Sequence, residues 1–273
     1  MALAYERMRA VLSAFSIDHA RLDLSHVMRA TGLPLSTAHR ILEDLVAAGV
    51  LEKDEQKLYV IGSRLWDLGI LSPRIYQQRT TIVPFLERLF LRTRQQTVLS
   101  TLHPNGAVVV EQLIGWREAR TSAGLGERLP LHATSPGIVA LAFGPPKLWR
   151  LLDGSAPARF TTSTITDDGA LRSVVERARR DGVAFTRREF VVDTASASAP
   201  VFSAPGELYG AISCVWDADA EDTAINEAKV SQLLRSAANG ASHALAEARN
   251  DVPRPVGKRR GLPRSATSPP DAR

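Results

Sequence analysis

The sequence predicts an α+β protein: an N-terminal winged helix-turn-helix, a helical linker, and a C-terminal α/β domain built on an antiparallel sheet. Three observations predict this order. Two helical apolar stripes flank a Gly-Pro turn near the N-terminus, arginine-rich helical sequence follows, and from residue 97 the pattern changes to β-rich runs of period two. We place the parts at residues 1–62, 63–95 and 96–249, followed by a basic tail at 250–273 that we expect to be disordered.

The helix-turn-helix is the best-defined motif. In the turn Thr31-Gly32-Leu33-Pro34, Gly32 can take the left-handed backbone that ends a helix, and Pro34 suits the first turn of the next helix. The second helix carries apolar residues at i, i+3, i+4 and i+7, which form one stripe for a core: Ala38, Ile41, Leu42 and Leu45. Gly49 ends this helix, and short apolar runs around residues 53–57 predict a two-stranded wing.

Polar side chains at the start of the second helix indicate binding to duplex DNA. Ser36, Thr37, His39 and Arg40 lie mostly off the apolar stripe. Hydroxyl and guanidinium groups at a helix N-terminus suit phosphates and base edges in a major groove. Arg40 is the strongest candidate, because a guanidinium fits bidentate contacts with guanine or phosphate. The alternatives are an ion pair with an acidic residue three or four positions on, and for His39 a plain exposed position.

Two further residues complete the predicted DNA-binding set. Ser25 reads as the N-cap of the first helix of the motif, and its hydroxyl could also hold a phosphate; a cap alone is the simpler role. Lys57 lies in the predicted turn of the wing, where an ammonium can reach the DNA backbone.

Net charge alone does not support DNA binding. The chain carries +5, but residues 252–273 hold six basic side chains and one acidic one, which accounts for the whole excess. Residues 1–72 hold eight basic and nine acidic side chains, a net charge of −1. The prediction therefore requires basic residues such as Arg40 and Lys57 to gather on one face, with the acidic residues turned elsewhere.

Length and composition limit the number of domains and the class of protein. A length of 273 residues suits two domains, and 44% hydrophobic with 23% charged residues is typical of a globular protein. No apolar run approaches the roughly 18 residues of a membrane helix, and charged residues interrupt the N-terminal apolar pattern, so we expect no signal peptide and a cytoplasmic location. Cys214 is the single cysteine, which excludes an internal disulfide, and no spacing suggests a metal or cofactor site.

The remaining elements follow from local patterns. Helices are predicted at residues 5–15, 80–94, 145–152, 168–181 and 218–249, and an apolar helix is predicted to follow Gly137 and end at Phe143. Strands are predicted at residues 97–102 and 107–114, joined by an Asn-Gly turn, and at 183–190, 195–202 and 208–216. We expect four or five strands, with helices on one side of an antiparallel sheet.

Together these patterns resemble the IclR family of bacterial transcription regulators. The resemblance rests on TGLPLSTAHRILEDLVAAGVLE and LYVIGSRLWDLG in the N-terminal part, and on GERLPLHATSPGIVALAF, DGVAFTRREF and ASASAPVFSAPGELYGAISCV in the C-terminal part. It covers about residues 5–248. It implies a DNA-binding protein, with no enzymatic activity, that acts on palindromic or repeated operators as a homodimer or homotetramer. It also implies that a sensor-like C-terminal domain binds a small organic effector. We expect the protein to repress transcription.

The family pattern also implies a pocket, where this chain departs from it. Ser196 stands where a pocket cysteine is common, Asp193 replaces a glycine, and Pro136 has no N–H to give an anion. The resemblance implies Ser135, Asp193, Ser196 and Ser213 as effector-binding candidates, each with a structural role as its alternative. Fewer donors and an added carboxylate favour an effector larger or less acidic than glyoxylate or pyruvate.

Two other functions remain open from the sequence. The first is a DNA-binding regulator whose sensor domain no longer binds a ligand. The second is an enzyme, because His132, Asp193 and Ser196 supply the residue types of a hydrolytic triad. No nucleophile-elbow pattern surrounds Ser196, however, and the Ala/Ser-rich strand around it suits close packing.

Overall fold

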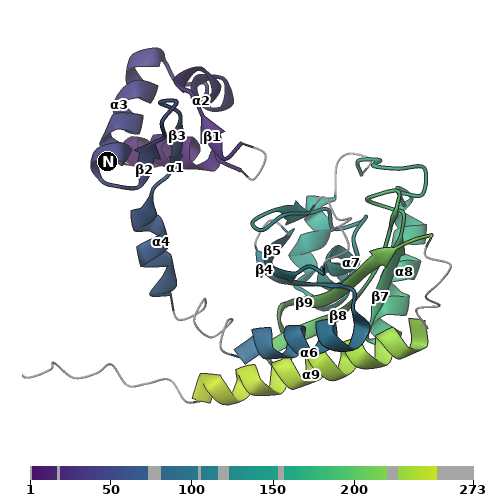
Figure 1. Cartoon of the computed structure of the whole chain (residues 1–273). Coiled ribbons are helices and arrows are strands. Elements are labelled where there is room, and N and C mark those ends of the chain that lie inside the picture. The colour runs from purple at the N-terminus through teal and green to yellow at the C-terminus, as the bar shows by residue number, and fades with distance from the viewer. Residues whose placement is uncertain are drawn as a thin grey trace, which may run out of the picture.

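The computed structural model describes residues 2–16, 19–72, 81–103, 106–115, 123–152, 157–219 and 227–250 (Figure 1). Our expectation of a disordered tail lies outside these residues, as does the Asn-Gly turn. None of the helices in the described ranges is both long and apolar enough to cross a membrane.

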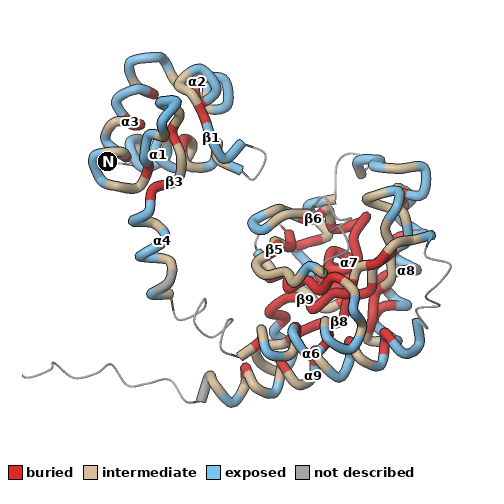
Figure 2. The backbone as a smooth tube through the Cα atoms, in the orientation of Figure 1, coloured by how far each residue is buried: buried red, intermediate tan, exposed pale blue. Residues whose placement is uncertain are grey.

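The N-terminal part is a winged helix-turn-helix, as predicted. Its elements are α1 (Ala2–Ser13), β1 (Arg21–Leu22), α2 (Leu24–Thr31), α3 (Leu35–Ala47), β2 (Leu51–Lys53) and β3 (Tyr59–Ile61). The predicted stripe of α3 is buried and packs with Val11 of α1, Val27 of α2 and Leu51 of β2 in one apolar core (Figure 2). This core holds α3 against the other elements and leaves its outer side exposed.

The turn between α2 and α3 follows the expected chemistry, but the cap of α2 does not. Gly32 has a φ of 68° and its N–H donates to the Met28 carbonyl at 2.8 Å, which closes α2. The prediction that Ser25 caps this helix is wrong. Asp23 is the cap, and its Oδ1 accepts from the His26 N–H at 2.7 Å. The helix begins one residue before Ser25, so the Ser25 side chain lies exposed on the first turn.

The wing contains one strand more than the sequence predicted. β2 and β3 form the expected antiparallel hairpin, and β1 pairs with the other edge of β3, giving the order β1-β3-β2. β1 has only two residues, too few for a period-two pattern to reveal it. Lys57 lies in the hairpin turn with a left-handed φ of 62°, and its N–H donates to the Asp54 carbonyl.

The C-terminal part is built on a six-stranded antiparallel sheet with the order β6-β5-β4-β9-β8-β7. The strands are β4 (Gln96–His103), β5 (Gly106–Leu113), β6 (Arg128–Leu129), β7 (Ala184–Arg187), β8 (Thr194–Ala204) and β9 (Glu207–Asp217). All five predicted strands are present, and β6 adds a short sixth. β7 is shorter than predicted because the chain turns at Arg188, whose φ is 69°.

Helices cover both faces of this sheet, so the expectation of helices on one side is wrong (Figure 1). α6 (Val83–Thr93) and α9 (Glu227–Asn250) pack on one face, while α7 (Ser135–Phe143), α8 (Asp168–Asp181) and the short 3-10 helix Pro146–Leu151 lie over the other. Strand β8 shows the physical reason. Its alanines, such as Ala197 and Ala199, face α9, and its serines, such as Ser198, face α7; small side chains on both sides admit helices on both sides.

The linker contains α4 (Ser63–Ile70), which follows β3 after a single residue. Between α4 and α6, residues 73–80 lie outside the described ranges. The domain boundaries that we predict at residues 62/63 and 95/96 fall next to element ends, since α4 begins at Ser63 and β4 begins at Gln96.

Candidate functional site

The outer side of α3 presents the polar residues that the sequence singled out. Ser36, His39 and Arg40 are exposed and Thr37 is half-buried, whereas Ala38 between them is fully buried. One helix therefore has an anchored face and a free face with hydroxyl, imidazole and guanidinium groups on it. This is the arrangement that a recognition helix needs to enter a major groove.

Arg40 makes the ion pair that was its structural alternative, but the pair is weak. Its Nη1 lies 3.3 Å from Asp44 Oδ2, and the two side chains are 67% and 59% exposed. Exposed i,i+4 pairs of this kind contribute about 0.3–0.5 kcal/mol. His39 Nε2 lies 3.9 Å from Glu43 Oε1, near the limit of an ion pair. Neither contact prevents these side chains from turning to DNA.

Several carboxylates of this part of the chain are neutralised by their neighbours. Glu43 Oε1 accepts from the Lys53 ammonium at 2.7 Å and from the Tyr59 hydroxyl at 2.8 Å. The Lys53 ammonium first, and then the Tyr59 hydroxyl, lower the pKa of the Glu43 carboxyl. Asp54 Oδ2 lies 2.7 Å from Arg21 Nη2. Each pair occupies one carboxylate and one cation, so the net charge of this part stays at −1. Arg40 and Lys57 are exposed on α3 and the wing and supply positive charge there.

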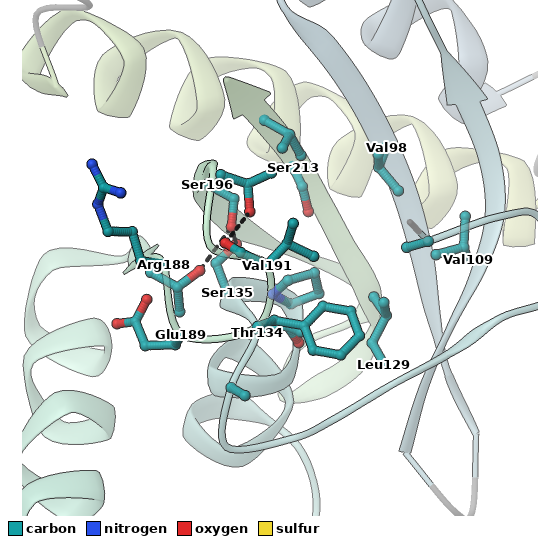
Figure 3. A pocket seen from close by; sticks show the side chains of 17 residues that line it. Val98, Val109, Leu129, Thr134, Ser135, Arg188, Glu189, Val191, Ser196 and Ser213 are labelled. Atoms are coloured by element: carbon teal, nitrogen blue, oxygen red, sulfur yellow. Dashed lines mark hydrogen bonds between the residues drawn. The ribbon is translucent and has the colours of Figure 1, made fainter. Parts of the chain in front are cut away.

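The C-terminal part contains a pocket between the sheet and the N-terminus of α7. Its cavity volume is about 60 Å³, several times the roughly 10–15 Å³ that one water molecule needs. In Figure 3, Val98, Val109 and Leu129 lie on one side of Ser135 and Ser196, and Arg188 and Glu189 lie on the other. The pocket therefore has an apolar wall and a polar end.

A continuous row of hydroxyl groups, which we call the hydroxyl row, forms the polar floor. Thr186 bonds to Ser196 at 2.8 Å, Ser196 to Ser135 at 2.7 Å, Ser135 to Ser198 at 2.7 Å, and Ser198 to Ser213 at 2.7 Å. Ser135, Ser196 and Ser213 all line the pocket, so the structure brings three of the four candidate residues together.

The fourth candidate lies elsewhere. Asp193 is not among the pocket-lining residues; its side chain is exposed, and its carbonyl accepts from the Ala218 N–H at 2.9 Å. The carboxyl at the pocket is Glu189, which is half-buried, and burial raises its pKa. Arg188 also lines the pocket; its guanidinium donates to the Val192 carbonyl and pairs with Asp219. Sequence reasoning missed both residues, because the predicted strand at residues 183–190 included them, whereas β7 ends at Arg187.

The N-terminus of α7 offers few donors to a ligand. Thr134 is its cap, and the Thr134 hydroxyl accepts from the Gly137 N–H at 3.1 Å. Pro136 has no N–H. A Cβ on Gly137 would lie 2.5 Å from the Pro130 carbonyl oxygen, so only glycine allows this close approach. Ser135 is the first helical residue, not the cap.

The residues of the conceivable triad serve other roles. His132 is buried, its Nε2 lies 2.8 Å from the Ala158 carbonyl, and its ring stacks on Phe160. The Ser196 hydroxyl bonds to Ser135 and Thr186 instead. Within the described ranges, no cluster of three or more His, Cys, Asp or Glu side chains could hold a metal ion. The geometry supports binding and not catalysis.

Comparison with known families decides the assignment. The model of the IclR helix-turn-helix domain matches residues 5–55, and that of the bacterial transcriptional regulator IclR C-terminal domain matches residues 77–243. The chain belongs to the IclR family. As a member, it is a DNA-binding transcriptional regulator with a small-molecule effector domain, and it is not an enzyme.

Individual IclR-family proteins match over most of the chain. The HTH-type transcriptional repressor AllR of Salmonella typhi is 30% identical over 250 residues, covering 89% of this chain and 90% of its own. The glycerol operon regulatory protein of Streptomyces griseus is 29% identical over 208 residues, 76% of this chain and 82% of its own. An IclR homolog from Microbacterium hydrocarbonoxydans, solved in complex with 4-hydroxybenzoate, matches with a TM-score of 0.79 and 28% identity, covering 89% and 99% of the two chains.

Proposed function

We propose that this regulator represses transcription by binding an operator through α3 and the wing, and that an effector in the pocket changes its operator affinity. The observation that carries the proposal is the coexistence of two built surfaces in one chain: the exposed polar face of α3, and the pocket over the hydroxyl row. Repression is consistent with the relative named as a transcriptional repressor. Because its DNA partner is cytoplasmic in bacteria, we propose that location for the protein.

On the DNA side, Arg40 reads bases from α3, with support from Ser36, Thr37 and His39. Ser25 and Lys57 contact phosphates from the flanking helix and the wing. A homodimer or homotetramer presents two such helices, and half-sites about one duplex turn apart match that symmetry. We keep residues 1–62 as the DNA-binding domain, 63–95 as the linker and 96–249 as the effector and oligomerisation domain.

On the effector side, Ser135, Ser196 and Ser213 contact a small organic molecule. The apolar wall and the few donors at α7 support a ligand larger or less acidic than glyoxylate or pyruvate. One relative was solved with 4-hydroxybenzoate, which supports an effector of about the size of a single aromatic ring. The presence of an open pocket favours this function over a regulator with a non-functional sensor domain.

The physical mechanism is a population shift. A ligand that binds one arrangement of the C-terminal domains more tightly favours that arrangement, and with it one spacing of the two recognition helices. A coupling free energy of about 1–3 kcal/mol changes operator affinity roughly 5- to 150-fold, which is enough for regulation.

A titration of the intergenic DNA upstream of the gene tests the DNA-binding half of the proposal. Arg40→Ala should reduce specific affinity to the nonspecific level, a loss of about tenfold or more, while the protein remains folded and oligomeric. Arg172→Ala is the control, because Arg172 is an exposed arginine on α8 that also makes an i,i+4 pair, with Asp168, although it also lies over the Trp149 ring. Specific affinity retained by Arg40→Ala would overturn the assignment of α3.

A further inference from the structure

The hydroxyl row has a proton count that constrains what can bind to it. Each hydroxyl contributes one proton and two lone pairs. The five hydroxyls are joined by four hydrogen bonds, which consume four of five protons and four of ten lone pairs. Rotating the hydroxyls moves the remaining O–H along the row but does not change the count. The row therefore retains one donor and six lone pairs, of which those on the fully buried Ser198 lie outside the pocket lining.

Three neighbouring groups add no free donor to the row. Pro136 has no N–H, and the Gly137 N–H is taken by the Thr134 hydroxyl. The Arg188 guanidinium donates to the Val192 carbonyl at 3.2 Å and pairs with the Asp219 carboxylate. In Figure 3 it points away from the apolar wall, beyond Ser196.

The opposite end of the pocket is lined by apolar side chains. Val98, Val109, Leu129 and Val215 line it, and Val98, Val109 and Leu129 are buried in one cluster. An ionised carboxylate placed between this wall and the hydroxyl row would need several donors, and the row itself supplies one. A neutral group that donates hydrogen bonds would find unused lone pairs instead.

We propose that the pocket selects an uncharged, largely apolar ligand that donates hydrogen bonds, namely a phenol, an alcohol or a primary amide. This proposal rests on the effector function proposed above. It discriminates against the carboxylate of the same shape. The selecting residues are Ser135, Ser196 and Ser213, with Pro136 removing the backbone donor that an acid would use.

The matched probes 4-hydroxybenzamide and 4-hydroxybenzoate differ only in that the first carries a neutral amide where the second carries a carboxylate. Calorimetric titration of the full-length protein should show the amide binding at least about tenfold more tightly. Two variants test the proton count itself. Ser196→Ala interrupts the row, removing two bonds and one proton, so the spare donors rise from one to two and the preference for the amide narrows. Thr186→Val removes one bond and one proton from the end of the row, so one spare donor remains and the preference persists.

Each alternative outcome is decisive. Equal or tighter binding of the acid by the wild-type protein overturns the ligand class and leaves the effector function standing. An equal change of preference in both variants overturns the proton-count explanation. If neither probe binds up to about 10 mM, the ligand class and the effector function proposed for this pocket both fail. Melting temperatures of the two variants establish that each is folded.

Discussion

The Ser135 hydroxyl lies 2.7 Å from the Ser196 hydroxyl, although the two residues are 61 positions apart in the chain. This contact joins the first residue of α7 to strand β8, and both residues line the pocket. A ligand that bonds to either hydroxyl therefore acts on a helix and a strand at once. Such a junction is suited to converting binding into a change of packing.

The first prediction concerns the true cap of α2. Asp23→Ala should lower the melting temperature by about 2–4 °C, because the His26 N–H loses its acceptor. Ser25→Ala should leave it unchanged, since the Ser25 side chain lies exposed on the first turn. Thermal unfolding followed by circular dichroism makes the comparison. An equal loss in both variants would contradict the assignment of the cap.

The same cap predicts a pH dependence. The His26 backbone N–H, followed by the His26 side chain, lowers the pKa of the Asp23 carboxyl. A carboxyl with a lowered pKa in the folded state stabilises above its unfolded pKa, about 3.9, and loses that contribution as pH falls through the folded value. Asp23→Asn keeps a capping oxygen without the charge, so its melting temperature at pH 7 should lie slightly below that of the wild type and should show a smaller decrease below about pH 4.

Lys57 should show opposite effects on stability and on DNA binding. Its φ of 62° is strained for a residue with a side chain, so Lys57→Gly should stabilise the protein by about 1 kcal/mol. The same change removes a phosphate contact and should reduce the slope of log affinity against log salt by about one. Lys57→Arg keeps both charge and strain and serves as the control. If Lys57→Gly binds DNA with an unchanged salt slope, the wing does not contact the backbone.

The sequence predicted the fold well where local patterns are strong. The stripe of Ala38, Ile41, Leu42 and Leu45 and the turn at Gly32 are local signals, and the structure confirms them. Sequence patterns did not predict the features that depend on contacts between distant segments. β1 exists only because β3 has a free edge. Helices lie on both faces because helices distant in the chain pack on the two sides of β8, and no single window of sequence shows that pairing.

The candidate pocket was predictable only in part. Ser135, Ser196 and Ser213 came from positions in the family pattern, and they lie at one pocket. Asp193 was included as a substitution in that pattern, yet it lies exposed in the turn before β8. Thr186 and Ser198 could not be foreseen, because their roles depend on which hydroxyls the sheet and α7 bring within hydrogen-bond distance.

Cys214 should be chemically inert in the folded protein. It is fully buried, its thiol lies 3.7 Å from the Thr93 hydroxyl, and burial raises its pKa to about 11. About one thousandth of the thiol is then ionised at pH 8, and thiolate is the reactive form. An aromatic disulfide reagent should label the native protein negligibly and the denatured protein with one equivalent. Rapid native labelling would show that this face of the sheet opens.

The central claim is that pocket and operator are thermodynamically coupled. The direct test is a fluorescence titration of the upstream DNA with full-length protein, with and without saturating 4-hydroxybenzamide, beside a calorimetric titration of the amide with and without the DNA. We expect operator affinity to change at least about fivefold, and the affinity for the amide to change by the same factor, as linkage requires. An amide that saturates the pocket while operator affinity stays constant would contradict the account.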